Sequence, residues 1–174
     1  MKHIILCGSR GVGKSTLIRR LLRETELPVY GFVTVKGRPD ETGEHATHIY
    51  PASLPAERRV PSVKNLVGKC GSGHLTAVYP EVFNREGCRC LDDYPERGIL
   101  VMDELGFMEN EAYGFQRAVY EHLKAEVPVI AAVKDKETAF LTAVRSWPNC
   151  QVYEITEENR DGMFRLLAPL VRRL

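Results

Sequence analysis

Residues 8–15 read GSRGVGKS, which fits the phosphate-binding pattern G-x-x-x-x-G-K-[S/T] at every fixed position. An apolar run at residues 3–7 precedes this motif and is typical of a strand buried on both faces. Residues 15–23 follow it, with leucine and isoleucine at helical spacing and arginines on the other side. Strand, glycine-rich loop and helix in this order predict an α/β fold with a nucleotide site near the start of the chain.

Each residue type in the motif has a physical role in holding phosphate. Glycines let the backbone N–H groups and the helix N-terminus point at an anion. Lys14 is expected to reach the terminal phosphates and to act in catalysis, and the Ser15 hydroxyl is expected to ligate Mg²⁺. The residues expected to bind the nucleotide are Gly8, Ser9, Arg10, Gly11, Val12, Gly13, Lys14, Ser15 and Thr16.

A second motif, ILVMDE at residues 99–104, ends an apolar strand in two carboxylates. Such a strand brings Asp103 to the sheet edge where ligands bind in open α/β sheets, so Asp103 is expected to hold Mg²⁺ together with Ser15. Glu104 follows at once, and a carboxylate in this position can orient or deprotonate an attacking water. This adjacency favours hydrolysis, with Glu104 as the catalytic base.

The remaining elements alternate between strand and helix, which predicts a three-layer fold with a mainly parallel sheet and helices on both faces. Strands are expected at residues 29–35, 48–50, 98–103, 127–133 and 151–155, and helices at about 109–125, at 137–145 and from about 158 to the end. Residues 36–43 are interpreted as turn, and residues 51–97 as short strands and loops. We expect one domain over residues 1–174, with an irregular insertion at about 36–97.

The net charge and the cysteine content indicate which kinds of partner and which cellular setting to expect. The formal net charge of +1 gives no attraction to polyanions or membranes, so nucleic acid is not indicated and no membrane partner is expected. Five scattered cysteines, an odd number, and no recognisable secretion signal favour a reduced, cytoplasmic setting.

Other nucleotide-dependent functions stay open at this point. Asp103 and Gly106 match the D-x-x-G of GTPase switches, but the segment AAVKDK at residues 131–136 lacks a complete N/T-K-x-D element for reading guanine. A nucleotide or small-molecule kinase would use the same glycine loop and add arginines from a lid. The candidates for that lid are Arg58, Arg59, Arg85, Arg89 and Arg97. A nucleotide-dependent binding module with little turnover is the third alternative.

Taken together, these motifs resemble the cancer-related nucleoside-triphosphatase family. Besides the glycine loop, the resemblance rests on GF at residues 31–32, VGK at 67–69, DELG-x-ME at 103–109 and NRD at 159–161. It implies a RecA-like or additional-strand P-loop fold with slow, Mg²⁺-dependent hydrolysis of several nucleoside triphosphates, ATP first and GTP, CTP and UTP as further candidates. A protein partner is not identified.

The resemblance also implies roles for two late residues and shows two departures. Asn159 and Arg160 would approach the base or ribose, with Gly106 beside the phosphates; the alternative is that Thr156 or Asn159 caps the last helix. Phe107 stands where the family usually has lysine, and Lys134 stands near the end of the 127–133 strand, where the family often has histidine.

Overall fold

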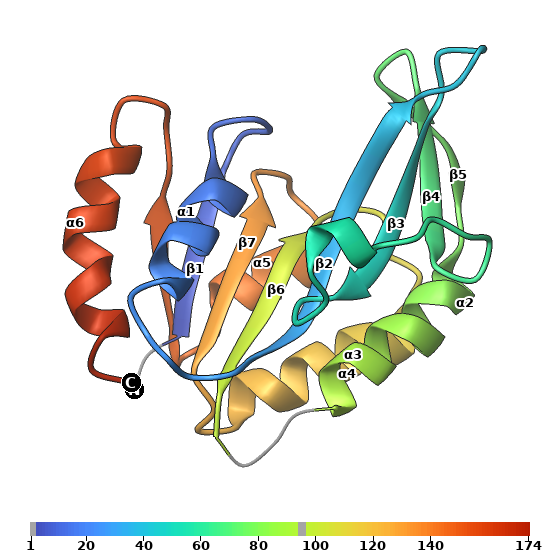
Figure 1. Cartoon of the computed structure of the whole chain (residues 1–174). Helices are drawn as coiled ribbons and strands as arrows, with labels where there is room; N and C mark the ends of the chain where they lie inside the picture. Colours follow the sequence, from blue (N-terminus) through green and yellow to red (C-terminus); the bar gives the residue numbers. More distant parts are fainter. Residues whose placement is uncertain (1–2, 94–96) are drawn as a thin grey trace.

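The computed structural model describes residues 3–93 and 97–174, and an eight-stranded sheet organises them (Figure 1). The strands are β1 (His3–Gly8), β2 (Val29–Pro39), β3 (His45–Pro51), β4 (Leu66–Gly71), β5 (His74–Val78), β6 (Ile99–Leu105), β7 (Val129–Lys134) and β8 (Cys150–Glu154). Their order across the sheet is β5-β4-β3-β2-β6-β7-β1-β8. The phosphate-binding motif therefore follows a strand with neighbours on both sides.

The sheet has a parallel part and an antiparallel part. Strands β2, β6, β7, β1 and β8 pair in parallel, whereas β3, β4 and β5 extend the sheet from β2 as antiparallel strands. Strand β7 lies between β1, which leads into the glycine loop, and β6, which carries the two carboxylates. One extra strand between these two is the arrangement expected of an additional-strand P-loop fold, and the mainly parallel sheet is confirmed.

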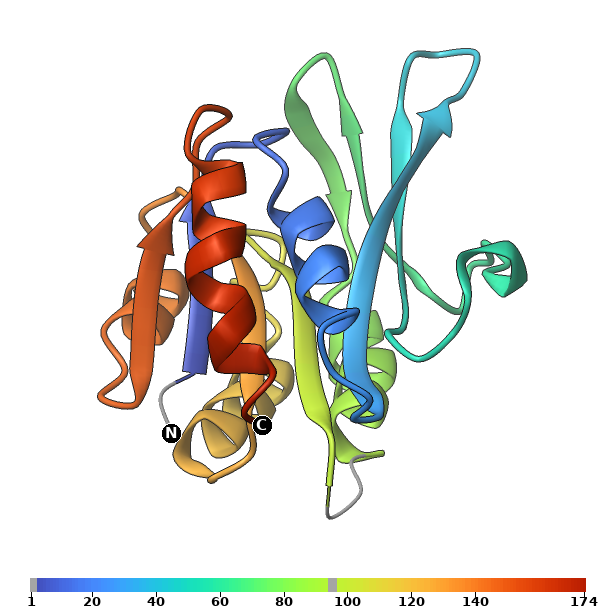
Figure 2. The ribbon, with the colours of Figure 1, turned by 60° about the vertical axis from the view of Figure 1, so that its left-hand side comes forward.

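Helices cover both faces of the parallel part (Figure 2). On one face lie α1 (Lys14–Leu22) and α6 (Arg160–Val171), and on the other lie α4 (Tyr113–Lys124) and α5 (Ala139–Arg145). A short 3-10 turn, η1 (Ala56–Arg58), follows β3. Among the described residues, no helix has the length and apolarity needed to cross a membrane.

Two hydrophobic cores form because central strands bury side chains on both faces. On β1, Ile5 packs into the core beneath α4 and α5, while Ile4 and Leu6 pack into the core beneath α1 and α6. All six β1 residues are buried, which explains why the sequence shows a continuous apolar run and not an alternating one. The two cores fix the position of the glycine loop that follows β1.

The expectation that residues 51–97 contain only short strands and loops is wrong. Pro80 begins a continuous helical stretch made of α2 (Pro80–Val82), η2 (Phe83–Gly87), which has π-helical hydrogen bonding, and α3 (Cys88–Asp92). At Gly87, within this stretch, a Cβ would lie 2.6 Å from the Phe115 ring of α4. Gly87 is therefore present for close packing of two helices.

Several other boundaries differ from expectation, and two of them bear on the site. The expected turn at residues 36–43 is shorter, because β2 continues to Pro39 and Asp40 Oδ1 accepts hydrogen bonds from the N–H groups of Thr42 and Glu44. The helix expected from Glu109 begins only at Tyr113. Glu109 turns inward instead, and its Oε2 accepts a hydrogen bond from the N–H of Gly106 at 3.0 Å.

Candidate active site

The glycine loop has the backbone conformation that its sequence predicts. Gly11 and Gly13 have φ values of +86° and +100°, in the left-handed region that favours glycine. Helix α1 begins at Lys14, whose side chain folds back over the loop. Its Nζ donates hydrogen bonds to the carbonyl oxygens of Gly8 at 2.7 Å and Ser9 at 2.9 Å. The loop thus holds a buried ammonium group in place at the carboxyl end of β1.

Ser15 and Asp103 meet although 88 positions separate them in the sequence. The Ser15 hydroxyl donates a hydrogen bond of 2.8 Å to Asp103 Oδ1. Burial raises the pKa of Asp103 to about 6 and the charge of Glu104 adds to this, while the Ser15 hydrogen bond lowers it. A cation beside Asp103 would favour its charged form.

This donor set fits Mg²⁺. A hydroxyl and a carboxylate are hard oxygen ligands, and Mg²⁺ usually takes only one or two carboxylates, completing its shell with water and substrate phosphates. Within residues 3–93 and 97–174, no group of three or more His, Cys, Asp or Glu side chains is placed to hold a metal ion. The site thus resembles one that binds a cation together with a phosphate ligand, and not a closed protein cage.

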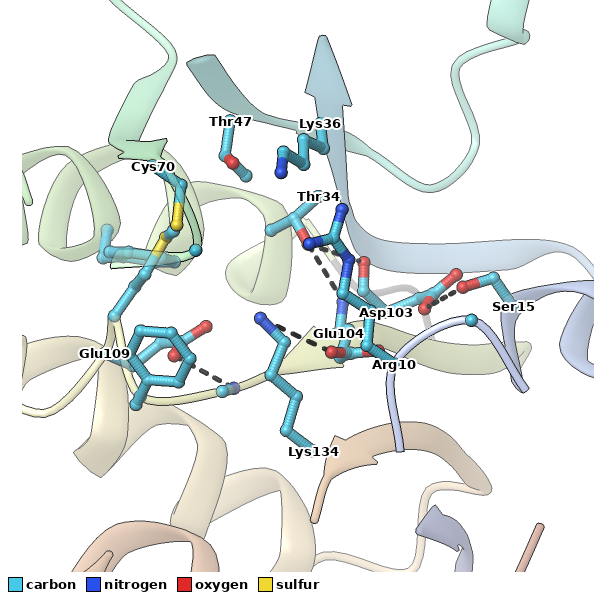
Figure 3. A pocket seen from close by; sticks show the side chains of 16 residues that line it. Arg10, Ser15, Thr34, Lys36, Thr47, Cys70, Asp103, Glu104, Glu109 and Lys134 are labelled. Atoms are coloured by element: carbon cyan, nitrogen blue, oxygen red, sulfur yellow. Dashed lines mark hydrogen bonds and ion pairs between the residues drawn. The ribbon is translucent and has the colours of Figure 1, made fainter. Parts of the chain in front are cut away.

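Glu104 lies between Lys14 and Lys134, and Figure 3 shows its contact with Lys134. Lys14 Nζ lies 3.4 Å from its Oε2, and Lys134 Nζ, from the end of β7, lies 3.6 Å from its Oε1. The backbone N–H of Glu104 donates to the Thr34 hydroxyl of β2 at 3.2 Å. The Glu104 side chain is 19% exposed, so it remains accessible to a reacting molecule.

A cleft of about 380 Å³ lies at the carboxyl ends of β1, β6 and β7, and its lining includes Thr34, Glu104 and Lys134. Strands β2 and β3 form the opposite wall, from which Thr34, Lys36 and Thr47 point inward (Figure 3). The glycine loop contributes Arg10, Gly11 and Ser15 to this lining, and the segment after β6 contributes Gly106 and Glu109. The cleft has room for a terminal phosphate and a nucleophile.

Glu109 is a buried carboxyl group in the lining of the cleft. It is 2% exposed, and burial raises its pKa to about 7, with a further increase from the charge of Glu104. The hydrogen bond to Gly106 fixes the loop that follows Glu104. This carboxyl group therefore positions the end of β6.

The other expected site residues lie outside the cleft lining. Arg160 Nη1 donates a long hydrogen bond of 3.4 Å to the Val12 carbonyl, and its side chain occupies the space where a Cβ on Gly13 would be. Asn159 binds locally: its Oδ1 accepts from the Thr156 N–H and its Nδ2 donates to the Glu154 carbonyl.

Arg160 thus supports the glycine loop from the α6 side. Thr16 is exposed and accepts a hydrogen bond from Arg19. Contact of Asn159 and Arg160 with a base or ribose stays a prediction.

The arginines considered for a kinase lid do not gather at this cleft. None of the five lines it in the described part of the chain. Arg85 and Arg89 pair with Glu86, Arg59 donates to the Leu54 carbonyl, and Arg97 borders a separate hollow with residues such as Leu27 and Leu174. Arg59 borders a neighbouring hollow that Ser15 and Asp103 also line, but among the described residues these five arginines form no cluster that could act as a lid.

Sequence reasoning missed several residues of the opposite wall. Thr34 and Lys36 are two positions apart on β2, and Thr47 of β3 pairs with Lys36 across the strands, so all three share one face. The polar alternation Thr34, Lys36 was a usable signal, but the expected strand ended at residue 35. Lys134 was noticed as a departure from a family, although its contact with Glu104 was not.

Comparisons with known proteins agree with this geometry. The family model described as NTPase matches residues 3–168. The chain is 30% identical to "Nucleoside-triphosphatase THEP1" of Thermococcus kodakarensis, covering 98% of this chain and 94% of that protein. It is 27% identical to "Cancer-related nucleoside-triphosphatase homolog" of Mus musculus, covering 98% and 97%.

A solved structure supports the fold independently. The crystal structure of THEP1 from Aquifex aeolicus superposes with a TM-score of 0.71 at 22% identity, covering 98% of this chain and 99% of that one. The likeness thus extends over the antiparallel strands and the late helix as well as the glycine loop. Since the family model spans nearly the whole chain, from β1 into α6, the chain belongs to the NTPase family.

Proposed function

We propose that the protein hydrolyses ATP and other nucleoside triphosphates to the diphosphate and inorganic phosphate in this cleft, with Mg²⁺. The observation that carries the proposal is the position of Glu104. This carboxylate follows the expected Mg²⁺ ligand Asp103 and is held by lysines on both of its oxygens at the end of the glycine loop. Membership of the NTPase family supports the same activity.

In the proposed mechanism the glycine loop binds the β- and γ-phosphates through its backbone N–H groups. Lys14 lies within reach of the same phosphates and would exchange its contacts with the Gly8 and Ser9 carbonyls for phosphate oxygens. Ser15 and Asp103 would hold Mg²⁺. When bound, this ion neutralises charge on the β- and γ-phosphates.

Glu104 would orient a water molecule opposite the bond to be broken and accept its proton. The water oxygen bonds to the γ-phosphorus as the bond from that phosphorus to the bridging oxygen breaks. The bridging oxygen leaves with the electron pair as part of the nucleoside diphosphate, and Glu104 later returns the proton to solvent. Most of the catalysis is then positioning and stabilisation of charge.

We further propose that GTP, CTP and UTP are substrates beside ATP and that the protein works in the cytoplasm. The first proposal is supported by the lack of a complete guanine-reading element after β7. The second is supported by five cysteines that are all free thiols.

A phosphate-release panel tests the activity. The wild-type protein is incubated with each of the four common ribonucleoside triphosphates and Mg²⁺, and phosphate and diphosphate are both measured, with Lys14→Met as the inactive control. We expect phosphate and diphosphate in equal amounts from wild type only. No release above the Lys14→Met control would refute hydrolysis, and binding without turnover would favour the binding-module alternative.

A further inference from the structure

Lys36 lies on the wall of the cleft opposite the glycine loop, beyond the residues expected to hold Mg²⁺. Strand β2 runs parallel to β6 with Val33 opposite Asp103, so Lys36 stands three residues further along. At about 3.3 Å per residue, its Cα lies about 10 Å beyond Asp103 in the strand direction. The Lys36 side chain points into the cleft (Figure 3). Lys36 is therefore placed to meet an anion that has moved away from the Mg²⁺ ligands.

The positive charge of Lys36 is not balanced by a carboxylate. Two other lysines near the cleft, Lys14 and Lys134, both pair with Glu104. Lys36, in contrast, forms no ion pair with any Asp or Glu side chain among residues 3–93 and 97–174. This wall of the cleft thus presents an unpaired ammonium group, and such a charge attracts anions.

Two threonines share the face of the wall that carries Lys36. Thr47 stands directly opposite Lys36 in the antiparallel pair of β2 and β3, where Cβ atoms are about 5 Å apart. Thr34 lies two residues before Lys36, and its hydroxyl accepts a hydrogen bond from the Glu104 N–H at 3.2 Å. The Thr47 hydroxyl and the Lys36 ammonium group are both hydrogen-bond donors, and together they suit phosphate oxygens. Thr34 connects this pair of donors to Glu104.

The inorganic phosphate product of the proposed reaction has the chemistry that this wall fits. Cleavage leaves the nucleoside diphosphate on the glycine loop, so the free phosphate has to leave the cleft on another side. The wall formed by β2 and β3 lies opposite the loop. Free phosphate has several strong acceptor oxygens and carries more charge than a carboxylate, so an unpaired ammonium group beside a hydroxyl attracts it.

We propose that Lys36 and Thr47 bind inorganic phosphate after cleavage and retain it before its release. This inference rests on the proposed function, because it names the product site of that reaction. No bond forms or breaks in this step, since the phosphate only exchanges contacts at the glycine loop for contacts with the ammonium and hydroxyl groups. Phosphate and nucleoside diphosphate then occupy opposite walls of the cleft, so both can be bound at once.

Calorimetric titration of inorganic phosphate into the protein saturated with ADP and Mg²⁺, at constant ionic strength, tests the site without turnover. Lys36→Met should raise the dissociation constant of phosphate about tenfold, because a charge-assisted contact is lost, while ADP affinity changes by less than about twofold. Thr47→Val keeps the shape of the side chain, removes only the hydroxyl and should raise the constant about threefold. The control Lys64→Met changes an exposed lysine that does not line the cleft, and it should match wild type.

A charge-conserving variant and the KM for ATP complete the test. Lys36→Arg should recover most of the phosphate affinity. An unchanged dissociation constant in Lys36→Met would refute the product site. If Lys36→Met raises the KM for ATP by the same factor as the dissociation constant of phosphate, Lys36 contacts the bound triphosphate, and the product site is also refuted. If wild type hydrolyses no triphosphate but binds phosphate through Lys36, the proposed hydrolysis fails, while the phosphate contact of Lys36 stands.

Discussion

Replacing Glu109 by glutamine should make the stability of the protein less dependent on pH. The Glu109 carboxyl is buried beneath the cleft, and burial raises its pKa from 4.5 to about 7. Its Oε2 accepts the Gly106 N–H, a hydrogen bond that the amide oxygen of glutamine can also accept. The variant thus removes the titration while keeping the contact.

The sign of this pH dependence follows from whether the folded or the unfolded state holds the Glu109 proton. Between about pH 4.5 and 7, the unfolded chain releases the Glu109 proton while the folded protein retains it, so the free energy of unfolding falls as the pH rises. The decrease in the free energy of unfolding levels off once the pH exceeds the pKa of Glu109 in the folded protein. A shift from 4.5 to about 7 corresponds to about 3 kcal/mol of stability, which wild type has at low pH and lacks above neutrality.

Urea unfolding from pH 5 to pH 8 measures this effect. Relative to wild type, Glu109→Gln should gain about 3 kcal/mol in free energy of unfolding over that range, and other titrating groups cancel in the difference. Glu111→Gln changes an exposed carboxyl in the same turn and should follow wild type. Parallel pH curves for wild type and Glu109→Gln would refute the assignment of a protonated, buried Glu109.

Two further variants test the metal site and the sheet. Ser15→Ala removes one of the two protein oxygens expected at Mg²⁺. The Mg²⁺ concentration for half-maximal phosphate release should therefore rise about tenfold. An unchanged Mg²⁺ titration would contradict the role of Ser15 as an Mg²⁺ ligand. Gly31→Ala should lower the free energy of unfolding by more than about 3 kcal/mol in urea, because φ is +90° and a Cβ would lie 2.0 Å from the Val101 carbonyl oxygen. Gly43→Ala, with φ of +81° but open space for a Cβ, should cost only about 1 kcal/mol, and equal losses would refute the steric argument.

The local parts of the fold could be predicted because their signals are local. The glycine loop and the helix after it lie within about twenty residues, and strands buried on both faces, such as β1 and β6, show as apolar runs. The helical stretch from Pro80 could not be recognised, because the role of Gly87 depends on Phe115, a residue of another helix. Close packing between distant segments leaves no mark in one sequence.

The residues of the candidate site could likewise be predicted only where their signals are local. Asp103 and Glu104 were found because they follow an apolar run directly. The ion pair between Glu104 and Lys134 depends on β7 lying beside β6, which strand order decides and periodicity does not. The inward turn of Glu109 was hidden for another reason, since a glutamate near a helix start is usually solvated.

The central claim is that Glu104 activates the water that attacks the γ-phosphate, and one comparison tests it most directly. Wild type and Glu104→Gln are measured for Mg²⁺-dependent ATP hydrolysis and for binding of the non-hydrolysable imido analogue of ATP. We predict that Glu104→Gln binds the analogue at least as well as wild type, because a competing negative charge is gone, while kcat falls about 10²- to 10⁴-fold. Hydrolysis by Glu104→Gln at the wild-type rate would contradict the mechanism.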